Sequence, residues 1–270
     1  SLKNPENRKV LYSLNSNKPI NPASTQKVVT ATVSLDTLGK DFNFVTSLYK
    51  TTNNELQLKL SGDPNLTKGG LSQLMKSAKK KNIIEPKAFY IDDFVMDSVE
   101  WGEGWQWDDD LNPLMPKFSS YNLDKNLLVA VVDPKTKGAP AQIHLTTFYP
   151  VTFMNLVTTG NDNNIELTRN NHISPDIITV NGEIKSRSYY QIPVNSPKRY
   201  FLIKLDEAIR DAKIEYYGRF TQRKTPENNI YLVDEIKHPI EKSLVEIFKN
   251  SNNMSAETLF KVAGGKFVNN

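Results

Sequence analysis

Apolar and polar residues follow two different periods along the chain. Alternation with a period of two is typical of a strand with one buried face, and apolar residues at every third or fourth position are typical of a helix. In the N-terminal part these patterns predict a strand at 9–15, a helix that begins after Pro22 and ends at Gly39, a hairpin over 44–60 with its turn at 51–55, a helix at 70–81 and a strand at 87–93. The apolar stripe of the first helix consists of Val28, Ala31, Thr32, Leu35 and Leu38.

The middle of the chain is expected to be rich in strands. Short apolar runs over 126–133 and 141–205 predict a small β-rich module inserted into the rest of the chain. Turn signals in this region fall at 159–161, 170–171 and 181–182. Helices are expected again at 241–250 and 255–263, the second ending at a glycine pair at 264–265.

The composition excludes several classes of protein and of site. No apolar run approaches the roughly 18 residues of a membrane span, and the N-terminus lacks a charged and apolar leader, so we expect neither a span nor a signal peptide in this chain. The absence of cysteine excludes disulfides and cysteine-ligated metals, and the three histidines are far apart, so no metal site is expected. The net charge of +4 is spread along the chain, and its densest lysine run, 76–81, is typical of a solvated helix face rather than a nucleic-acid site.

Residues 101–118 break the regular pattern. They contain all three tryptophans of the chain, three consecutive aspartates and two prolines. Loops this rich in aromatic residues are unusual unless they pack over something or bind something. We therefore expect this tryptophan segment (residues 101–118) to do more than connect two elements.

Ser24 and Lys27 form an S-x-x-K pair at the start of the first expected helix. Positions three apart on a helix lie about 5–6 Å from each other on one face, so the lysine amine can reach the serine hydroxyl. Unpaired N–H groups at a helix N-terminus favour an anion such as a developing alkoxide, and a dehydrated lysine has a lowered pKa and can accept the serine proton. Ser24 is therefore a candidate nucleophile and Lys27 its candidate base.

The pattern alone leaves a second interpretation open. S-x-x-K also begins at Ser47, in an expected strand, and at Ser77, in the lysine-rich helix. Serine is in addition a preferred N-cap residue, and Pro22 fits an ordinary helix start. Ser24 can thus be interpreted as a cap alone, and a further motif is needed to decide between the two roles.

That further motif lies near the other end of the chain. Ser251 and Asn253 form an S-x-N between two expected helices, with A-E-T-L-F-K close behind. Together, PASTQK and SNNMSAETLFK resemble the active-site motifs of the penicillin-recognising serine enzymes. In particular they resemble the D-alanyl-D-alanine carboxypeptidase/endopeptidase family of class C low-molecular-mass penicillin-binding proteins, peptidase family S13. The resemblance extends over nearly the whole chain through LSGDPNL at 60–66, YIDDFVMD at 90–97, GWQWDDDLNP at 104–113 and FSSYNLDKNLLVAVV at 118–132.

The resemblance implies a role for each residue that matches the two motifs. Ser24 would attack a peptide carbonyl and form an acyl-enzyme, with Lys27 as general base. Ser251 would pass a proton to the leaving amine, and Asn253 would hold the substrate backbone. These four residues would therefore form one catalytic site.

The same resemblance places the tryptophan segment near the mouth of the active site. Trp105 and Asp108 would then contact an amino-bearing side chain of the substrate. A second interpretation is equally open, in which the tryptophans form a core between domains and the acids form its solvated rim.

The function implied by the resemblance is that of an extracytoplasmic serine-type D-Ala-D-Ala carboxypeptidase/endopeptidase. Its substrates would be peptidoglycan stem peptides that end in D-Ala-D-Ala, and β-lactams would inhibit it covalently. No cofactor and no nucleic acid is implied, and peripheral association with a membrane is left open. The residues also leave two alternatives: a non-catalytic cell-wall peptide-binding relative with the same scaffold, and a β-lactamase- or esterase-like serine hydrolase.

The implied fold is of the α/β (α+β) class, a penicillin-recognising serine transpeptidase-like domain interrupted by a long insert that forms additional β-rich domains. We expect the transpeptidase-like domain at 1–50 and 241–270, a first insert domain at 51–135 and 206–240, and a smaller β-rich insert domain at 136–205. The third motif of the family, K-T-G, has no match in the chain. The C-terminal part of the transpeptidase-like domain is therefore expected to be missing, and the activity of the 270 residues on their own is left open.

Overall fold

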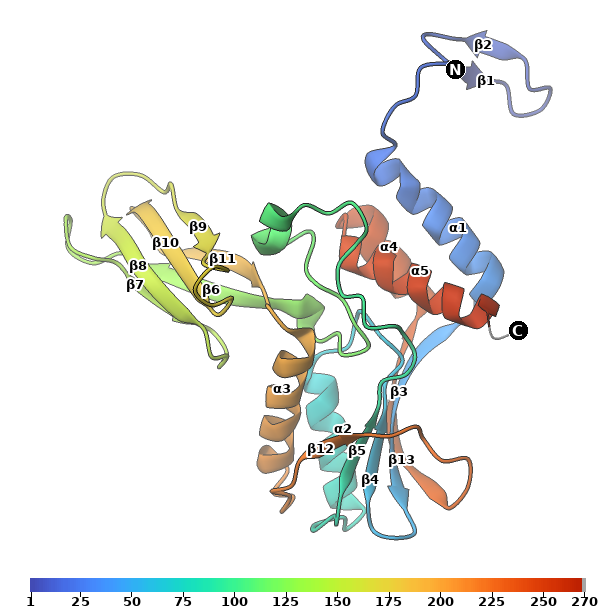
Figure 1. The fold of residues 1–270 in the computed structure, drawn as a ribbon, viewed down its shortest axis with the longest axis vertical. Helices are drawn as coiled ribbons and strands as arrows, with labels where there is room; N and C mark the ends of the chain where they lie inside the picture. Colours follow the sequence, from blue (N-terminus) through green and yellow to red (C-terminus); the bar gives the residue numbers. More distant parts are fainter. Residues whose placement is uncertain (269–270) are drawn as a thin grey trace.

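The computed structural model describes residues 1–268 and has a mixed α/β fold (Figure 1). Its α-helices are α1 (Gln26–Leu38), α2 (Lys68–Lys80), α3 (Pro197–Asp211), α4 (Ile240–Lys249) and α5 (Asn253–Val268). Short 3₁₀ turns are η1 (Ala23–Thr25), η2 (Trp107–Leu111) and η3 (Asp124–Asn126). The strands are β1 (Leu2–Lys3), β2 (Val10–Tyr12), β3 (Asn43–Thr51), β4 (Leu56–Lys59), β5 (Phe89–Asp92), β6 (Leu127–Asp133), β7 (Gln142–Leu145), β8 (Thr152–Thr159), β9 (Glu166–Arg169), β10 (Ile177–Ile184), β11 (Ser188–Pro193), β12 (Phe220–Gln222) and β13 (Ile230–Pro239). Within residues 1–268 no helix is both long and apolar enough to cross a bilayer.

The largest sheet among the described residues has five strands in the order β12-β5-β4-β3-β13. The hairpin predicted over 44–60 is confirmed as β3 and β4, and the N–H of Thr51 donates to the carbonyl of Glu55 at 2.9 Å across its turn. β13 comes from the C-terminal part of the chain and pairs antiparallel with β3 along its whole length. This pairing brings the segment that leads into α4 beside the segment that follows α1.

Two three-stranded sheets occupy most of the predicted β-rich module. One has the order β11-β6-β7 and the other the order β8-β10-β9, in which β8 and β10 run parallel. The turn predicted at 181–182 is wrong, because β10 continues through it and Gly182 pairs with Val157. Gly182 has a φ of +116°, and a Cβ there would lie 2.4 Å from the backbone oxygen of Asn164. This glycine therefore permits a close approach of two segments rather than a turn.

Helix α3 occupies a stretch in which the sequence predicts strands up to residue 205. It begins at Pro197, and the side chain of Ser196 caps it by accepting a hydrogen bond from the N–H of Arg199. Proline at the first helical position and serine at the N-cap are helix-start signals, but the aromatic and branched residues that follow favour a strand. The buried apolar residues of α3 nevertheless recur with a helical period: Tyr200, Phe201, Leu205, Ala208 and Ile209.

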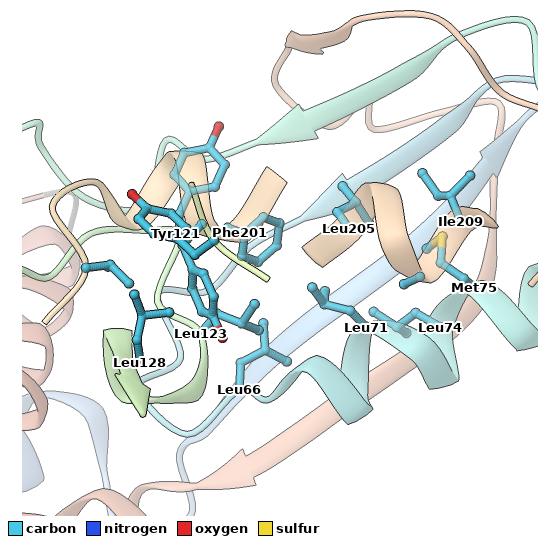
Figure 2. Close-up of a cluster of buried hydrophobic side chains, with 14 of the residues drawn as sticks. Leu66, Leu71, Leu74, Met75, Tyr121, Leu123, Leu128, Phe201, Leu205 and Ile209 are labelled. Carbon is cyan, nitrogen blue, oxygen red and sulfur yellow. The ribbon is translucent and has the colours of Figure 1, made fainter. Parts of the chain in front are cut away.

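Helices α2 and α3 pack against each other and enclose part of the main hydrophobic core (Figure 2). Leu71, Leu74 and Met75 of α2 face Leu205 and Ile209 of α3, and all five side chains are fully buried. Burial of one side chain of this size contributes about 1.5–3 kcal/mol to stability. Because α2 also contacts β13, this core attaches α3 to the five-stranded sheet.

A second hydrophobic cluster joins α1, α4 and α5 at the end of the sheet where β3 begins (Figure 1). It contains Leu38 and Phe44 from the N-terminal part of the chain and Ile247 and Leu259 from α4 and α5. The N-terminal and C-terminal parts of the sequence therefore share one core.

The buried face of α1 differs from the apolar stripe that the sequence predicts. Its buried residues are Lys27, Ala31, Ser34 and Leu38, whereas Val28 is 56% exposed. Small side chains at a helix contact allow the two axes to approach closely. Lys27 shares this face with the small residues Ala31 and Ser34. It therefore lies, in place of a valine, where α1 packs against α5.

Helix α5 is longer than the sequence predicts. The helix end expected at 264–265 is wrong, because α5 continues to Val268 and neither glycine of the pair has a positive φ. A glycine inside a helix costs about 1 kcal/mol relative to alanine, which tertiary packing readily offsets.

The division into three domains stays a prediction. α3 crosses the boundary expected at 205–206, and β6 pairs with β7 and β11 across the one expected at 135–136. Residues 269–270 of the expected transpeptidase-like domain lie outside the described residues.

Replacement of Leu74 by alanine tests the core between α2 and α3. Because Leu74 is fully buried, Leu74→Ala should lower the free energy of unfolding by about 2–5 kcal/mol, measured by urea denaturation. The matched control is Leu156→Ala on β8, where the leucine is 59% exposed and the change should stay within about 0.5 kcal/mol. Equal losses in the two variants would contradict the assignment of the core.

Candidate active site

Ser24 lies in η1, the 3₁₀ turn that leads into α1. The side-chain oxygen of Asn21 accepts a hydrogen bond from the N–H of Ala23 at 3.0 Å and so fixes the start of this turn. Ala23 has a φ of +45°, a left-handed conformation that costs a residue with a Cβ about 1–2 kcal/mol. Strain of this kind persists where the surroundings impose it, and it is common at functional sites. The side chain of Ser24, directly after Ala23, is exposed.

The hydroxyl of Ser24 does not cap a helix. Neither η1 nor α1 begins with a side-chain capping hydrogen bond. Within the described part of the chain, Ser24 Oγ makes a single hydrogen bond, which it accepts from Lys27 Nζ at 3.4 Å. The sequence leaves two interpretations of Ser24 open, a helix cap and a nucleophile. A cap requires a side-chain hydrogen bond at the helix start, and neither η1 nor α1 has one.

Lys27 Nζ lies between two serine side chains. It donates to Ser24 Oγ at 3.4 Å, to Ser251 Oγ at 3.0 Å and to the backbone oxygen of Ser251 at 3.0 Å. The start of α1 alone places the amine near Ser24, because the two residues are three positions apart. Ser251 reaches the same amine only because α5 packs on α1.

Lys27 is buried, at 7% exposure, and its hydrogen-bond acceptors are neutral oxygens. Burial lowers the pKa of Lys27, because desolvation disfavours the charged ammonium. A lysine that loses its proton more easily is a better general base near neutral pH. The geometry therefore permits Lys27 to take the proton of Ser24.

Ser251 occupies a sharp corner between α4 and α5. Its φ is +53°, and the side-chain oxygen of Asn252 accepts a hydrogen bond from the N–H of Ser255 at 2.7 Å, which caps the first turn of α5. The N–H of Asn253 donates to the carbonyl of Leu114 in the tryptophan segment at 3.3 Å. The corner is thus attached both to its own helix and to a distant loop.

A cavity of about 580 Å³ opens beside the two residues of the S-x-x-K motif. Ser24, Lys27, Asn253 and Trp105 all line it. The structure therefore brings together residues from the two ends of the sequence and from the tryptophan segment, as the resemblance implies. Ser251 joins this group through its hydrogen bonds with Lys27.

The tryptophan segment is held by packing between aromatic rings. The ring of Trp105 lies edge-to-face with those of Trp101 and Phe118, at centroid distances of 5.1 and 5.8 Å. Trp101 Nε1 also donates to the carbonyl of Trp105 at 3.2 Å. Trp105 thus belongs to an aromatic cluster and lines the cavity as well, so each of the two interpretations describes part of its surroundings.

Asp108 does not line the cavity. It is exposed on η2, so its expected contact with substrate stays a prediction. Its neighbour Asp110 forms an ion pair with Arg169 at 3.0 Å and accepts a hydrogen bond from Asn171 at 2.9 Å. The aspartate run therefore attaches the tryptophan segment to β9 and the loop after it.

Two carboxylates that sequence reasoning did not single out also line the cavity. Glu103 is exposed, whereas Glu257 is half-buried. Burial raises the pKa of Glu257, and the nearby charge of Lys261 only partly opposes this. The available signal for Glu257 was its spacing, because it follows Asn253 by four positions and so shares a helix face with it.

Residues 2–269 match the model of the D-Ala-D-Ala carboxypeptidase 3 (S13) family. The chain belongs to this family. Its sequence is 26% identical over 274 aligned residues to the D-alanyl-D-alanine carboxypeptidase DacB of Haemophilus influenzae, an alignment that covers 96% of this chain and 57% of the relative. The membership predicted from PASTQK and SNNMSAETLFK is thereby confirmed.

Solved structures share the fold of this S13 family chain. The crystal structure of penicillin binding protein 4 (dacB) from Haemophilus influenzae matches it with a TM-score of 0.83 at 24% identity, over 99% of this chain and 62% of the other. A structure of the same protein complexed with a novel β-lactam matches with a TM-score of 0.75 at 22% identity, over 99% and 61% of the two chains. The chain thus spans 57% to 62% of the length of these relatives.

The environment of Lys27 can be tested by titration. Because burial lowers its pKa, the Lys27 amine should lose its proton with a midpoint below 10.5, the ordinary lysine value. Heteronuclear NMR of the lysine side chains measures this midpoint, and the resonance is assigned by its disappearance in Lys27→Met. A midpoint at or above 10.5 would contradict a desolvated amine.

Proposed function

We propose that this chain carries the nucleophile, the general base and the proton relay of an extracytoplasmic serine-type D-Ala-D-Ala carboxypeptidase/endopeptidase. The observation that carries the proposal is the position of Lys27 Nζ, 3.4 Å from Ser24 Oγ and 3.0 Å from Ser251 Oγ, beside an open cavity. Family membership and the activity named for the DacB relative support the substrate class. The location follows from the substrate, because peptidoglycan lies outside the cytoplasmic membrane.

Acylation begins at Ser24. Its Oγ attacks the carbonyl carbon of the penultimate D-alanine, and the neutral amine of Lys27 takes the hydroxyl proton. The backbone N–H of Ser24 donates to the oxyanion that forms, and loss of one such donor typically costs roughly 10²–10³ in rate. Asn253, at the cavity wall, holds the peptide backbone in place.

Collapse of the tetrahedral intermediate requires a proton on the leaving amine. Ser251 Oγ accepts a hydrogen bond from Lys27 Nζ at 3.0 Å, so it can give its own proton to the amine of the terminal D-alanine and recover one from Lys27. The C–N bond breaks, D-alanine leaves, and the shortened peptide stays on Ser24 as an ester. Water then hydrolyses the ester, with Lys27 as base, and restores Ser24.

β-Lactams enter the same reaction as inhibitors. Attack by Ser24 opens the lactam ring, but the amine that leaves the carbonyl stays tethered to the acyl group. The attached fragment keeps the site occupied, and hydrolysis of the ester is slow. The structure of the related penicillin binding protein 4 complexed with a β-lactam supports this part of the proposal.

A fluorescent penicillin tests the nucleophile in the full-length protein. Ser24→Ala should reduce covalent labelling to the background level, because the proposal gives the attack on the carbonyl to Ser24 and only the proton relay to Ser251, whose hydroxyl also contacts Lys27. Ser47→Ala is the matched control, since Ser47 belongs to another S-x-x-K and is buried in β3; it should retain labelling. Absence of labelling in the folded, unaltered protein would overturn the proposed function, and rapid turnover of the label would indicate a β-lactamase instead.

The role of Lys27 predicts a pH dependence of acylation. A general base works only without its proton, so the acylation rate should rise with pH through the lowered pKa of Lys27 and level off above it. Lys27→Ala should reduce the rate constant by at least roughly 10²-fold, in the range that general-base catalysis contributes. Circular dichroism checks that the variant is folded. Normal labelling of folded Lys27→Ala would exclude Lys27 as the base.

A further inference from the structure

The corner that carries Ser251 is built around one residue of α4, Glu246. Its backbone oxygen accepts hydrogen bonds from the N–H of Asn250 at 3.2 Å and of Asn252 at 3.1 Å, one on each side of Ser251. Its carboxylate accepts a further hydrogen bond from the side-chain amide of Asn250 at 3.0 Å. Glu246 therefore accepts hydrogen bonds from the residues on both sides of Ser251, and it does not line the cavity.

Lys125, from a distant part of the sequence, binds the same carboxylate. Its Nζ lies 2.7 Å from Glu246 Oε2, and the Glu246 side chain is only 16% exposed. Burial by itself would raise the pKa of Glu246, but the hydrogen bonds from Lys125 and Asn250 outweigh it and hold that pKa below its usual range. The ion pair is therefore formed with a charged glutamate at neutral pH.

The backbone on both sides of Lys125 is strained. Asp124, Lys125 and Asn126 have φ values of +49°, +58° and +55°, and three successive non-glycine residues in the left-handed region are costly. The conformation persists because both flanking side chains are anchored. Asp124 Oδ2 accepts a hydrogen bond from the hydroxyl of Tyr200 at 3.0 Å. Asn126 Nδ2 donates to the side-chain oxygen of Asn122 at 2.9 Å.

The strained turn thus makes three separate attachments. Asp124 is bound to α3, Asn126 is bound within the buried 118–126 segment, and Lys125 between them reaches α4. Strain that the surroundings over-determine is typical of functional sites. The ion pair links this turn to the serine corner.

We propose that Lys125 and Glu246 are positioning residues that hold Ser251 at hydrogen-bond distance from Lys27. The inference rests on the proposed function, in which Ser251 relays the proton to the leaving group. Hydrogen bonds weaken steeply with distance and angle, and a misplacement of about 1 Å can cost 10²-fold in rate. Loss of the ion pair should therefore impair the acylation step, even though neither residue touches the substrate.

A purely structural ion pair predicts a different result. A pair that is partly exposed contributes little to global stability, so its removal would reduce at most the fraction of folded protein. The rate constant of the molecules that remain folded would not change. The rate constant of acylation and the final labelled fraction therefore separate the two roles.

Lys125→Met in the full-length protein tests the proposal with the fluorescent penicillin. The acylation rate constant should fall roughly ten- to a hundredfold, while the final labelled fraction and the initial non-covalent affinity for the penicillin stay as in the unaltered protein. Lys125→Arg should restore most of the rate, because a guanidinium keeps the charge and the hydrogen bond to the carboxylate. Methionine and arginine, like lysine, carry a Cβ, so neither variant changes the strain at this position.

The matched control is Lys237→Met, which removes an ion pair with Glu235 on β13 at 2.5 Å. It should leave the rate constant unchanged. Labelling of Lys125→Met at the unaltered rate, or a loss confined to the labelled fraction, would overturn the inference alone. A rate loss that Lys125→Arg shares in full would also overturn it. Absence of labelling in the unaltered protein would overturn the proposed function and the inference together.

Discussion

The side-chain nitrogen of Lys27 joins two serines that are 227 residues apart in the sequence. Lys27 Nζ donates to Ser24, which the same helix start presents, and to Ser251, which arrives from the other end of the chain. Hydrogen bonds are effective only over a narrow range of distance and angle. The site therefore depends on how accurately α1 and α5 are held together.

Two features of the fold provide that accuracy. β13 pairs with β3 along its length, so the strand that leads into α4 is held in register with the strand that follows α1. The second hydrophobic cluster then packs α1, α4 and α5 on one another through Leu38, Ile247 and Leu259. These contacts bury Lys27, and burial lowers its pKa.

The long region between Lys27 and Ser251 also contributes to the candidate site. The tryptophan segment supplies Trp105 to the cavity and a carbonyl, that of Leu114, to the N–H of Asn253. The following segment supplies Lys125 to Glu246, beside the serine corner. This region is therefore in direct contact with the corner that carries Ser251.

Local patterns in the sequence predict the elements that carry their own signals. Alternation located β3 and β4, and the helical period with Gly39 located α1. Where two local signals conflict, the prediction fails. The aromatic and branched residues of α3 favour a strand, whereas Ser196 and Pro197 signal a helix start. Asn-Gly at 181–182 is a turn signal, yet Gly182 lies inside β10. In both places packing against another segment decides the outcome.

For the site, local sequence patterns identify the side chains that are candidates for the chemistry. They place Ser24 and Lys27 on one helix turn and Ser251 in a corner between two helices, because short-range spacing and backbone geometry depend on neighbouring residues only. Packing between distant segments sets the surroundings of these side chains. It brings Lys27 to Ser251 and Lys125 to Glu246, and it places Trp105, but not Asp108, at the cavity wall. Such contacts depend on packing between segments far apart in the chain, so the spacing of neighbouring residues does not predict them.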